Sequence, residues 1–242
     1  MPSVLLVRHG RSTANTGGVL AGWTPGVDLD DAGRQQAQDL AARMSTLPLA
    51  AVVSSPLDRC LRTAEAVATV PGPRRAARPD VVVDDRLGEC RYGDWTGREL
   101  ATLTKDPLWT VVQRHPSAAV FPGPDGESLR AMQLRALDAV REWDARIAAT
   151  HGPDALWVAV SHGDVIKSIV ADAVGAHLDA FQRIVVDPCS VTVVHYTGTR
   201  PFLLRCNDTG GDLAALVPKR RRRPRRSRVA EPDAVVGGST GV

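Results

Sequence analysis

The sequence lacks any run of about 18 consecutive apolar residues, so we expect no membrane span. It also lacks an N-terminal basic segment followed by an apolar segment, and we therefore expect no secretory signal. Its four cysteines are scattered without CxxC spacing, which argues against a disulfide framework or a zinc knuckle. Reduced thiols of this kind are typical of a cytoplasmic protein, and we expect that location.

The histidines show no spacing typical of metal ligands. No HExxH pattern occurs, and no paired-ligand spacing involves His115, His151, His177 or His195. We therefore expect neither a metal nor another cofactor.

Basic charge is concentrated near the C-terminus. Residues 219–228 hold eight of the 30 Lys and Arg residues, so the rest of the chain is slightly acidic although the net charge is +3. Few apolar residues follow position 217, and we expect a catalytic domain over 1–217 and a disordered Arg-rich tail over 218–242. The tail predicts at most weak contact with nucleic acid or an acidic surface, because it contains no aromatic residue for base stacking.

Two apolar strands are each followed by a His-Gly pair. Residues 4–7 lead into Arg8-His9-Gly10, and residues 156–160 lead into Ser161-His162-Gly163. Uninterrupted apolar runs are typical of strands buried on both faces, and ligands of α/β proteins bind beyond the carboxyl ends of such strands. A single histidine at a strand end is commonly structural, but the repeated pattern favours two imidazoles in one pocket.

The remaining pattern predicts an α/β protein. Apolar residues at helical spacing predict helices near 31–44, 57–69, 129–149 and 164–174. Further strands are expected at 51–53 and 81–83, and 190–196 with 201–205 as an antiparallel edge pair that could join two copies in a homodimer. Residues 89–97 are expected to form a loop over the site, whose aromatic residues either line its mouth or pack beneath it.

The side chains near these strand ends suit phosphoryl transfer. Two guanidiniums, Arg8 and Arg59, match the oxygens of a phosphate dianion, and a neutral imidazole is a competent nucleophile. A carboxylic acid such as Glu89 can protonate a departing alkoxide. Taken alone, Arg59 could equally be a surface charge and Glu89 a solvated loop acid.

Four motifs in order resemble the histidine phosphatase superfamily. They are Arg8-His9-Gly10 with Ser12 and Asn15, residues 54–59 (SSPLDR), residues 87–97, and Ser161-His162-Gly163. The resemblance implies a three-layer α/β/α sandwich, mostly parallel with an antiparallel edge, and a phosphohistidine on His9. It implies that Glu89 is the general acid and base, and that the phosphate pocket contains Arg8, Ser12, Asn15, Arg59, His162 and Gly163.

The same family contains phosphatases and phosphomutases. Its cofactor-dependent mutases carry a longer insertion between the residues corresponding to Glu89 and His162. We therefore expect a metal-independent phosphomonoesterase of small molecules, with a phosphoglycerate mutase-type activity as the alternative. The loops expected to select the substrate are residues 23–28, 91–96 and 109–126, and their sequences do not identify it.

Overall fold

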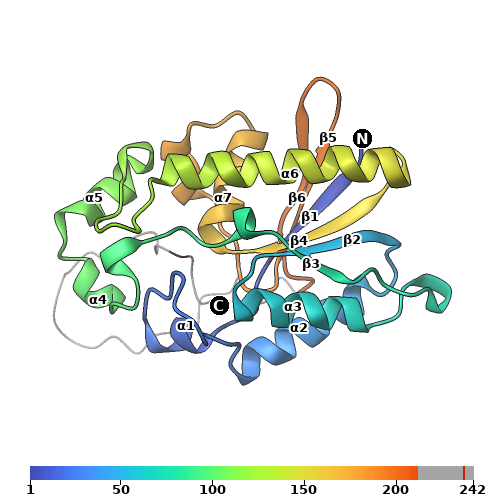
Figure 1. Cartoon of the computed structure of the whole chain (residues 1–242), viewed down its shortest axis with the longest axis horizontal. Helices are drawn as coiled ribbons and strands as arrows, with labels where there is room; N and C mark the ends of the chain where they lie inside the picture. The colour runs from blue at the N-terminus through green and yellow to red at the C-terminus, as the bar shows by residue number, and fades with distance from the viewer. Residues whose placement is uncertain (212–236, 238–242) are drawn as a thin grey trace.

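The computed structural model describes residues 1–211 and Gly237 (Figure 1). A single six-stranded sheet, in the order β3-β2-β4-β1-β5-β6, organises this part of the chain. Its strands are β1 (Ser3–Arg8), β2 (Leu49–Ser54), β3 (Val81–Val83), β4 (Leu156–Ser161), β5 (Val191–Tyr196) and β6 (Pro201–Asp208). The first four are mutually parallel, β5 is antiparallel to β1, and β6 is antiparallel to β5.

The strand register places the predicted functional residues together at the carboxyl ends of the parallel strands. Arg8 at the end of β1 is paired with Ser161 at the end of β4, and Ser54 at the end of β2 is paired with Val160. The backbone N–H of His9 extends this ladder by donating to the Ser161 carbonyl over 3.0 Å. The residues that follow β1, β2 and β4 therefore emerge side by side.

Helices cover both faces of the sheet, as Figure 1 shows for α6 (Leu129–His151) and α7 (Gly163–Ala173) above it and α2 (Asp31–Met44) and α3 (Asp58–Thr69) below it. Successive side chains of β1 alternate between these two layers: Val4 and Leu6 lie in one core cluster, and Leu5 and Val7 lie in the other. This double burial explains the uninterrupted apolar run. The predicted α/β/α sandwich with an antiparallel edge is confirmed.

Shorter elements complete the described part of the chain. They are α1 (Thr13–Gly17), α4 (Leu100–Leu103), α5 (Pro107–Arg114), and the 3-10 helices η1 (Pro73–Arg75), η2 (Asp85–Leu87), η3 (Gly93–Trp95), η4 (Pro116–Ala118) and η5 (Leu178–Arg183). The frequent prolines of residues 107–124 account for the short helices there.

Helix caps fix the ends of the longer helices. The side chain of Asp30 accepts from the Gly33 N–H over 2.7 Å at the start of α2, and it also accepts from Arg11 Nε over 2.7 Å. At the start of α6, the hydroxyl of Ser128 accepts from the Ala131 N–H over 3.0 Å. The helices predicted near 31–44 and from 129 begin where these capping residues place them.

The loop after β1 is pressed against the first turn of α2. A Cβ atom added to Gly10 would lie 2.6 Å from the carbonyl oxygen of Gly33, and one added to Gly33 would overlap the backbone of Arg11. Both positions thus require glycine because no side chain fits between the two backbones. This contact fixes the backbone that carries His9.

The segment 89–97 does not only cover the site, because its aromatic side chains are buried in the core. Tyr92 and Trp95 are fully buried, and both contact Phe121 edge-on. Trp95 also stacks on Trp109 of α5 at 6.1 Å between ring centroids. Of the two roles left open by the sequence, the structure therefore shows packing for these two aromatic residues.

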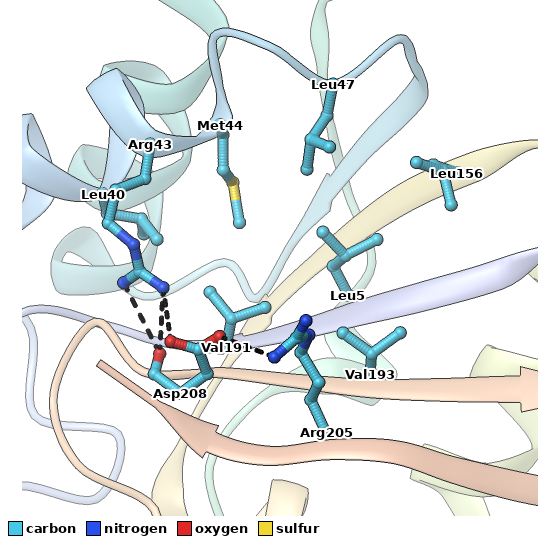
Figure 2. A pocket seen from close by; sticks show the side chains of 10 residues that line it. All are labelled: Leu5, Leu40, Arg43, Met44, Leu47, Leu156, Val191, Val193, Arg205 and Asp208. Carbon is cyan, nitrogen blue, oxygen red and sulfur yellow. Dashed lines mark hydrogen bonds and ion pairs between the residues drawn. The ribbon is translucent and has the colours of Figure 1, made fainter. Parts of the chain in front are cut away.

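A cavity of about 250 Å³ lies on the α2 side of the sheet (Figure 2). Its lining is mostly apolar, and at one end Arg43 pairs with Asp208 over 2.7 Å. The lining residues are Leu5, Leu40, Arg43, Met44, Leu47, Leu156, Val191, Val193, Arg205 and Asp208. It contains none of the predicted site residues.

Within residues 1–211 and Gly237, no helix has the length and apolar character needed to cross a membrane.

Candidate active site

His9 and His162 meet where β1 and β4 end. Their ring centroids are 5.2 Å apart with the ring planes inclined at 62°, and both side chains are almost completely buried. The parallel pairing of β1 with β4 produces this proximity, because each histidine directly follows the last residue of its strand. The structure thus brings together the two imidazoles expected in one pocket.

Hydrogen bonds orient the ring of His9. Its Nδ1 lies 2.7 Å from the carbonyl oxygen of Gly10, which can only accept, so Nδ1 carries the proton. Its Nε2 accepts from Nε of Arg59 over 3.3 Å and is therefore the unprotonated nitrogen, which carries the lone pair. Burial lowers the pKa of His9 well below its ordinary value, and the Arg59 and Arg8 cations lower it further. The ring is neutral, as a nucleophile must be.

Arg59 lies between the two histidines. It belongs to the first turn of α3, is almost completely buried, and donates from Nη2 to the Gly22 carbonyl over 2.9 Å. The same Nη2 is 3.3 Å from Nδ1 of His162. Arg62, one turn further along, is instead exposed and pairs with Glu65 over 3.0 Å. The structure therefore distinguishes a site arginine from a surface arginine in the same helix.

Arg8 supplies a second buried cation. Its Nη1 donates to the Val186 carbonyl over 2.8 Å, and its Nη2 donates to the Gly237 carbonyl over 3.3 Å. Burial lowers the pKa of Arg8, but a guanidinium remains charged at neutral pH. Gly237 also donates its N–H to Asp164 over 3.0 Å, so this one residue of the C-terminal region lies against the site.

Glu89 faces His162 across the pocket. Its Oε2 is 3.8 Å from His162 Nδ1, and its Oε1 accepts from the Cys90 N–H over 2.9 Å. Burial is the largest cause that raises the pKa of Glu89 to about 7, and the neighbouring Asp164 carboxylate adds to it. A carboxyl group with such a pKa can both donate and accept a proton near neutral pH.

Arg135 of α6 holds the backbone on which Glu89 lies. It donates to the carbonyl oxygens of Arg86, Gly88 and Glu89 over 2.7, 2.8 and 2.9 Å. On the opposite side, the indole N–H of Trp23 donates to the same Glu89 carbonyl over 2.6 Å. These bonds fix the position of the carboxyl group in the absence of regular secondary structure.

The other predicted substrate-binding residues lie in the helices that follow β1 and β4. Ser12 caps α1 and forms a reciprocal capping box with Asn15, whose Oδ1 accepts from the Ser12 N–H and hydroxyl over 3.0 and 2.9 Å. Gly163 is the first residue of α7, directly after His162. Their predicted contact with phosphate stays a prediction.

Two further buried polar side chains at the site were not identified from the sequence. Asp164 is fully buried, accepts from the Tyr92 hydroxyl over 3.0 Å, and raises the pKa of Glu89. Ser55 is fully buried with its hydroxyl 2.8 Å from Nε2 of His162. Both adjoin sequence motifs, but a polar residue beside a motif does not by itself indicate which group it contacts.

In the part of the chain that the structure describes, no group of three His, Cys, Asp or Glu side chains is arranged to hold a metal ion.

The sheet topology, with two buried histidines and two buried arginines at or after the ends of the parallel strands, is that of an α/β enzyme. A sequence profile of the histidine phosphatase superfamily (branch 1) matches residues 4–209, and the chain belongs to this superfamily. The family and the fold predicted from the four motifs are thereby confirmed.

Relatives of the chain include proteins named as mutases and as phosphatases. The chain is 30% identical to a probable phosphoglycerate mutase, GpmB, of Proteus mirabilis, with 90% of this chain and 96% of that protein covered. It is 29% identical to phosphoserine phosphatase 1 of Hydrogenobacter thermophilus, with 86% and 93% covered. A solved mycobacterial glucosyl-3-phosphoglycerate phosphatase in complex with VO3 has a TM-score of 0.73 and 25% identity, with 85% and 99% covered.

The raised pKa of Glu89 predicts a pH-dependent stability difference between the native protein and Glu89→Gln. Between pH 4.5 and about 7 the folded state holds a proton on Glu89 that the unfolded chain has released. The free energy of unfolding of the native protein should therefore fall, relative to that of the variant, by up to about 1.4 kcal/mol per pH unit across this range, and stay level above it. Urea unfolding of both proteins from about pH 4 to about pH 8 measures the difference.

The lowered pKa values of His9 and His162 also make stability depend on pH. Their contribution is common to both proteins and cancels in the comparison. A constant difference in unfolding free energy between the two proteins across the range would contradict a buried, protonated Glu89.

Proposed function

We propose that the protein is a metal-independent phosphomonoesterase that acts on small-molecule phosphate esters through a phosphohistidine on His9. The observation that carries this proposal is the lone pair on His9 Nε2, which lies beside the guanidinium of Arg59 in a buried pocket. A dianionic phosphoryl group bound to Arg8 and Arg59 would meet that lone pair directly. The arginine charges would stabilise the negative charge that spreads over the phosphoryl oxygens in the transition state.

The proposed reaction has two steps that share one carboxyl group. In the first, His9 Nε2 forms a bond to phosphorus, the bond to the ester oxygen breaks, and protonated Glu89 gives its proton to the departing alkoxide. In the second, the Glu89 carboxylate takes a proton from water, whose oxygen attacks phosphorus and releases phosphate and free His9. A pKa of about 7 suits both steps, because each protonation state is then populated near neutral pH.

His162 has a supporting role in this proposal. Its Nδ1 lies near both Arg59 and Glu89, from where it would bind a phosphoryl oxygen once protonated. Ser12, Asn15 and Gly163 are proposed to complete the phosphate pocket through their polar groups and the N-terminus of α7.

A phosphoglycerate mutase-type activity is the second candidate, and the name of the Proteus relative supports it. Two observations favour the phosphatase. The segment between Glu89 and His162 is short for a cofactor-dependent mutase, and another relative, at 29% identity, is named as a phosphoserine phosphatase.

The two activities are separated by one assay. We expect release of phosphate from p-nitrophenyl phosphate in the presence of EDTA, with little interconversion of 2- and 3-phosphoglycerate. The chelator arm tests metal independence at the same time. Rapid isomerisation with negligible phosphate release would establish the mutase alternative, and loss of activity in EDTA with recovery on adding zinc would exclude the proposed chemistry.

The role of His9 is tested by trapping the covalent intermediate. We expect His9→Ala to lower turnover by about 10³-fold or more and to abolish acid-labile phosphorylation of the protein, because the variant lacks the proposed acceptor of the phosphoryl group. His177→Ala, which removes an exposed imidazole at the N-cap of η5, is the matched control. Label retained on the His9 variant would assign the nucleophile to another residue.

We also propose a catalytic domain over residues 1–217 and an appended Arg-rich tail over 218–242. The family match ending at 209 supports the boundary. The predicted disorder of the tail concerns residues outside those that the structure describes, apart from Gly237. Eight basic residues within 219–228 support weak, salt-dependent binding of nucleic acid or another acidic surface.

A homodimer through the β6 edge is the proposed assembly. β6 is an outer strand of the sheet, and its side chains Phe202 and Leu204 are 48% and 59% exposed. An unpaired edge with exposed apolar side chains is suited to pairing with a second copy.

All four cysteines are free thiols, which supports the proposed cytoplasmic location, and cell fractionation would test it.

The Arg-rich tail and the edge strand β6 are each tested with one variant, and each variant is the control for the other. Replacing the eight basic residues of 219–228 by Gln should abolish retention of labelled single-stranded RNA at low salt and leave turnover unchanged. Leu204→Lys should convert the dimer to a monomer in sedimentation velocity, while the Gln variant stays dimeric. RNA retention by the Gln variant, or a monomeric native protein, would contradict the respective proposal.

A further inference from the structure

The two ring nitrogens of His162 lie in different surroundings. Nδ1 is 3.3 Å from Arg59 Nη2 and 3.8 Å from Glu89 Oε2. Nε2 is 2.8 Å from the hydroxyl of Ser55 and 3.4 Å from the thiol of Cys60. The histidine, serine and thiol are all fully buried, so these contacts are shielded from solvent.

The guanidinium fixes which nitrogen of neutral His162 carries the proton. A guanidinium can only donate, so Nδ1 must accept from Arg59 and cannot itself be protonated in the neutral ring. The proton therefore lies on Nε2, where an acceptor is needed because a buried donor without a partner is costly. The Ser55 hydroxyl is the nearer of the two groups, and hydroxyl oxygen accepts better than sulfur.

The Ser55 hydroxyl is itself held in place. The Leu57 N–H donates to the hydroxyl oxygen over 3.4 Å, and the Ser55 N–H donates to the Val160 carbonyl over 2.9 Å. The Cys60 thiol donates to the Ser161 carbonyl over 3.5 Å, so its proton is directed to the backbone of β4.

We propose that Ser55 is a positioning residue that keeps a proton on Nε2 of His162, so that Nδ1 is the atom that gains a proton and binds the phosphoryl group. The inference rests on the proposed function only for its second half, the binding of phosphoryl oxygen. When Nδ1 becomes protonated, the Nε2–H bond to Ser55 persists and strengthens, because the donor is then cationic. The hydroxyl thus favours the imidazolium without contacting substrate.

Other charged and titratable groups also act on His162 and set the background for any pH test. They are Arg8 at the end of β1, His9 directly after it, Arg59 and Cys60 in α3, Glu89 after η2, and Arg135 in α6. All remain in place when only the Ser55 hydroxyl is removed. A change in Ser55→Ala is therefore assignable to the hydroxyl.

The neighbouring Ser54 provides a matched control. It is also fully buried, but its hydroxyl donates to the Ser55 carbonyl over 2.8 Å instead of contacting His162. Ser54→Ala and Ser55→Ala therefore remove the same atom from adjacent, equally buried positions. A general loss of packing or stability would affect both.

The first measurement is the ¹⁵N chemical shift of the His162 ring nitrogens, assigned with a His162→Gln variant. We expect the neutral ring to carry its proton on Nε2 in the native protein and in Ser54→Ala, and we expect the Nε2 shift in Ser55→Ala to move to that of an N–H without a hydrogen-bond acceptor. A proton on Nδ1 in the native protein, or an unchanged shift in Ser55→Ala, would overturn the proposal. This measurement needs no turnover, so it decides the role of Ser55 even if the proposed function fails.

The second measurement is the pH profile of kcat for phosphate release. Ser55→Ala should lower kcat by about 10- to 100-fold, as loss of a group that orients a site ligand commonly does, and move the alkaline limb to lower pH because the imidazolium loses its acceptor. Ser54→Ala should leave the limb in place. Equal shifts of the alkaline limb in both variants would show that Ser55 has only a structural role. In Ser55→Thr, which retains a hydroxyl, the alkaline limb should lie at the same pH as in the native protein.

Discussion

The guanidinium of Arg59 lies between two buried imidazoles, and the candidate site depends on this contact. Because the group can only donate, each histidine must present a lone pair to it, which fixes the position of the proton on both neutral rings. Its positive charge also helps to keep both rings neutral. Two neutral imidazoles beside buried guanidiniums are the combination that the proposed attack on a phosphate dianion requires.

The sheet makes this contact geometrically possible. Parallel pairing of β1 with β4 brings His9 beside His162, and the pairing of β2 with β4 delivers Ser55 to the same edge. Arg59 follows a few residues after β2, in the first turn of α3. Residues far apart in the sequence therefore share one pocket because three neighbouring strands end at the same level.

The sequence was sufficient to predict features that depend on local pattern. The apolar run before Arg8-His9-Gly10 predicted a doubly buried strand, and the repeated His-Gly pair predicted the meeting of two imidazoles, because both follow from strand periodicity. Ser55 and Asp164 were not identified, since their contacts depend on which elements lie alongside them. For the aromatic residues of 89–97 the pattern left two roles open, because their partners Phe121 and Trp109 come from distant segments.

Arg135 donates hydrogen bonds only to main-chain oxygens of the loop that carries Glu89. These hydrogen bonds do not depend on the side chains of the residues whose carbonyl groups accept them. Neighbouring positions such as Arg91, which is exposed over the ring of Trp23, can consequently be exchanged in evolution while the backbone path stays the same. New preferences for the organic part of a phosphate ester can therefore arise at these positions while the backbone that carries the proposed acid, Glu89, is retained.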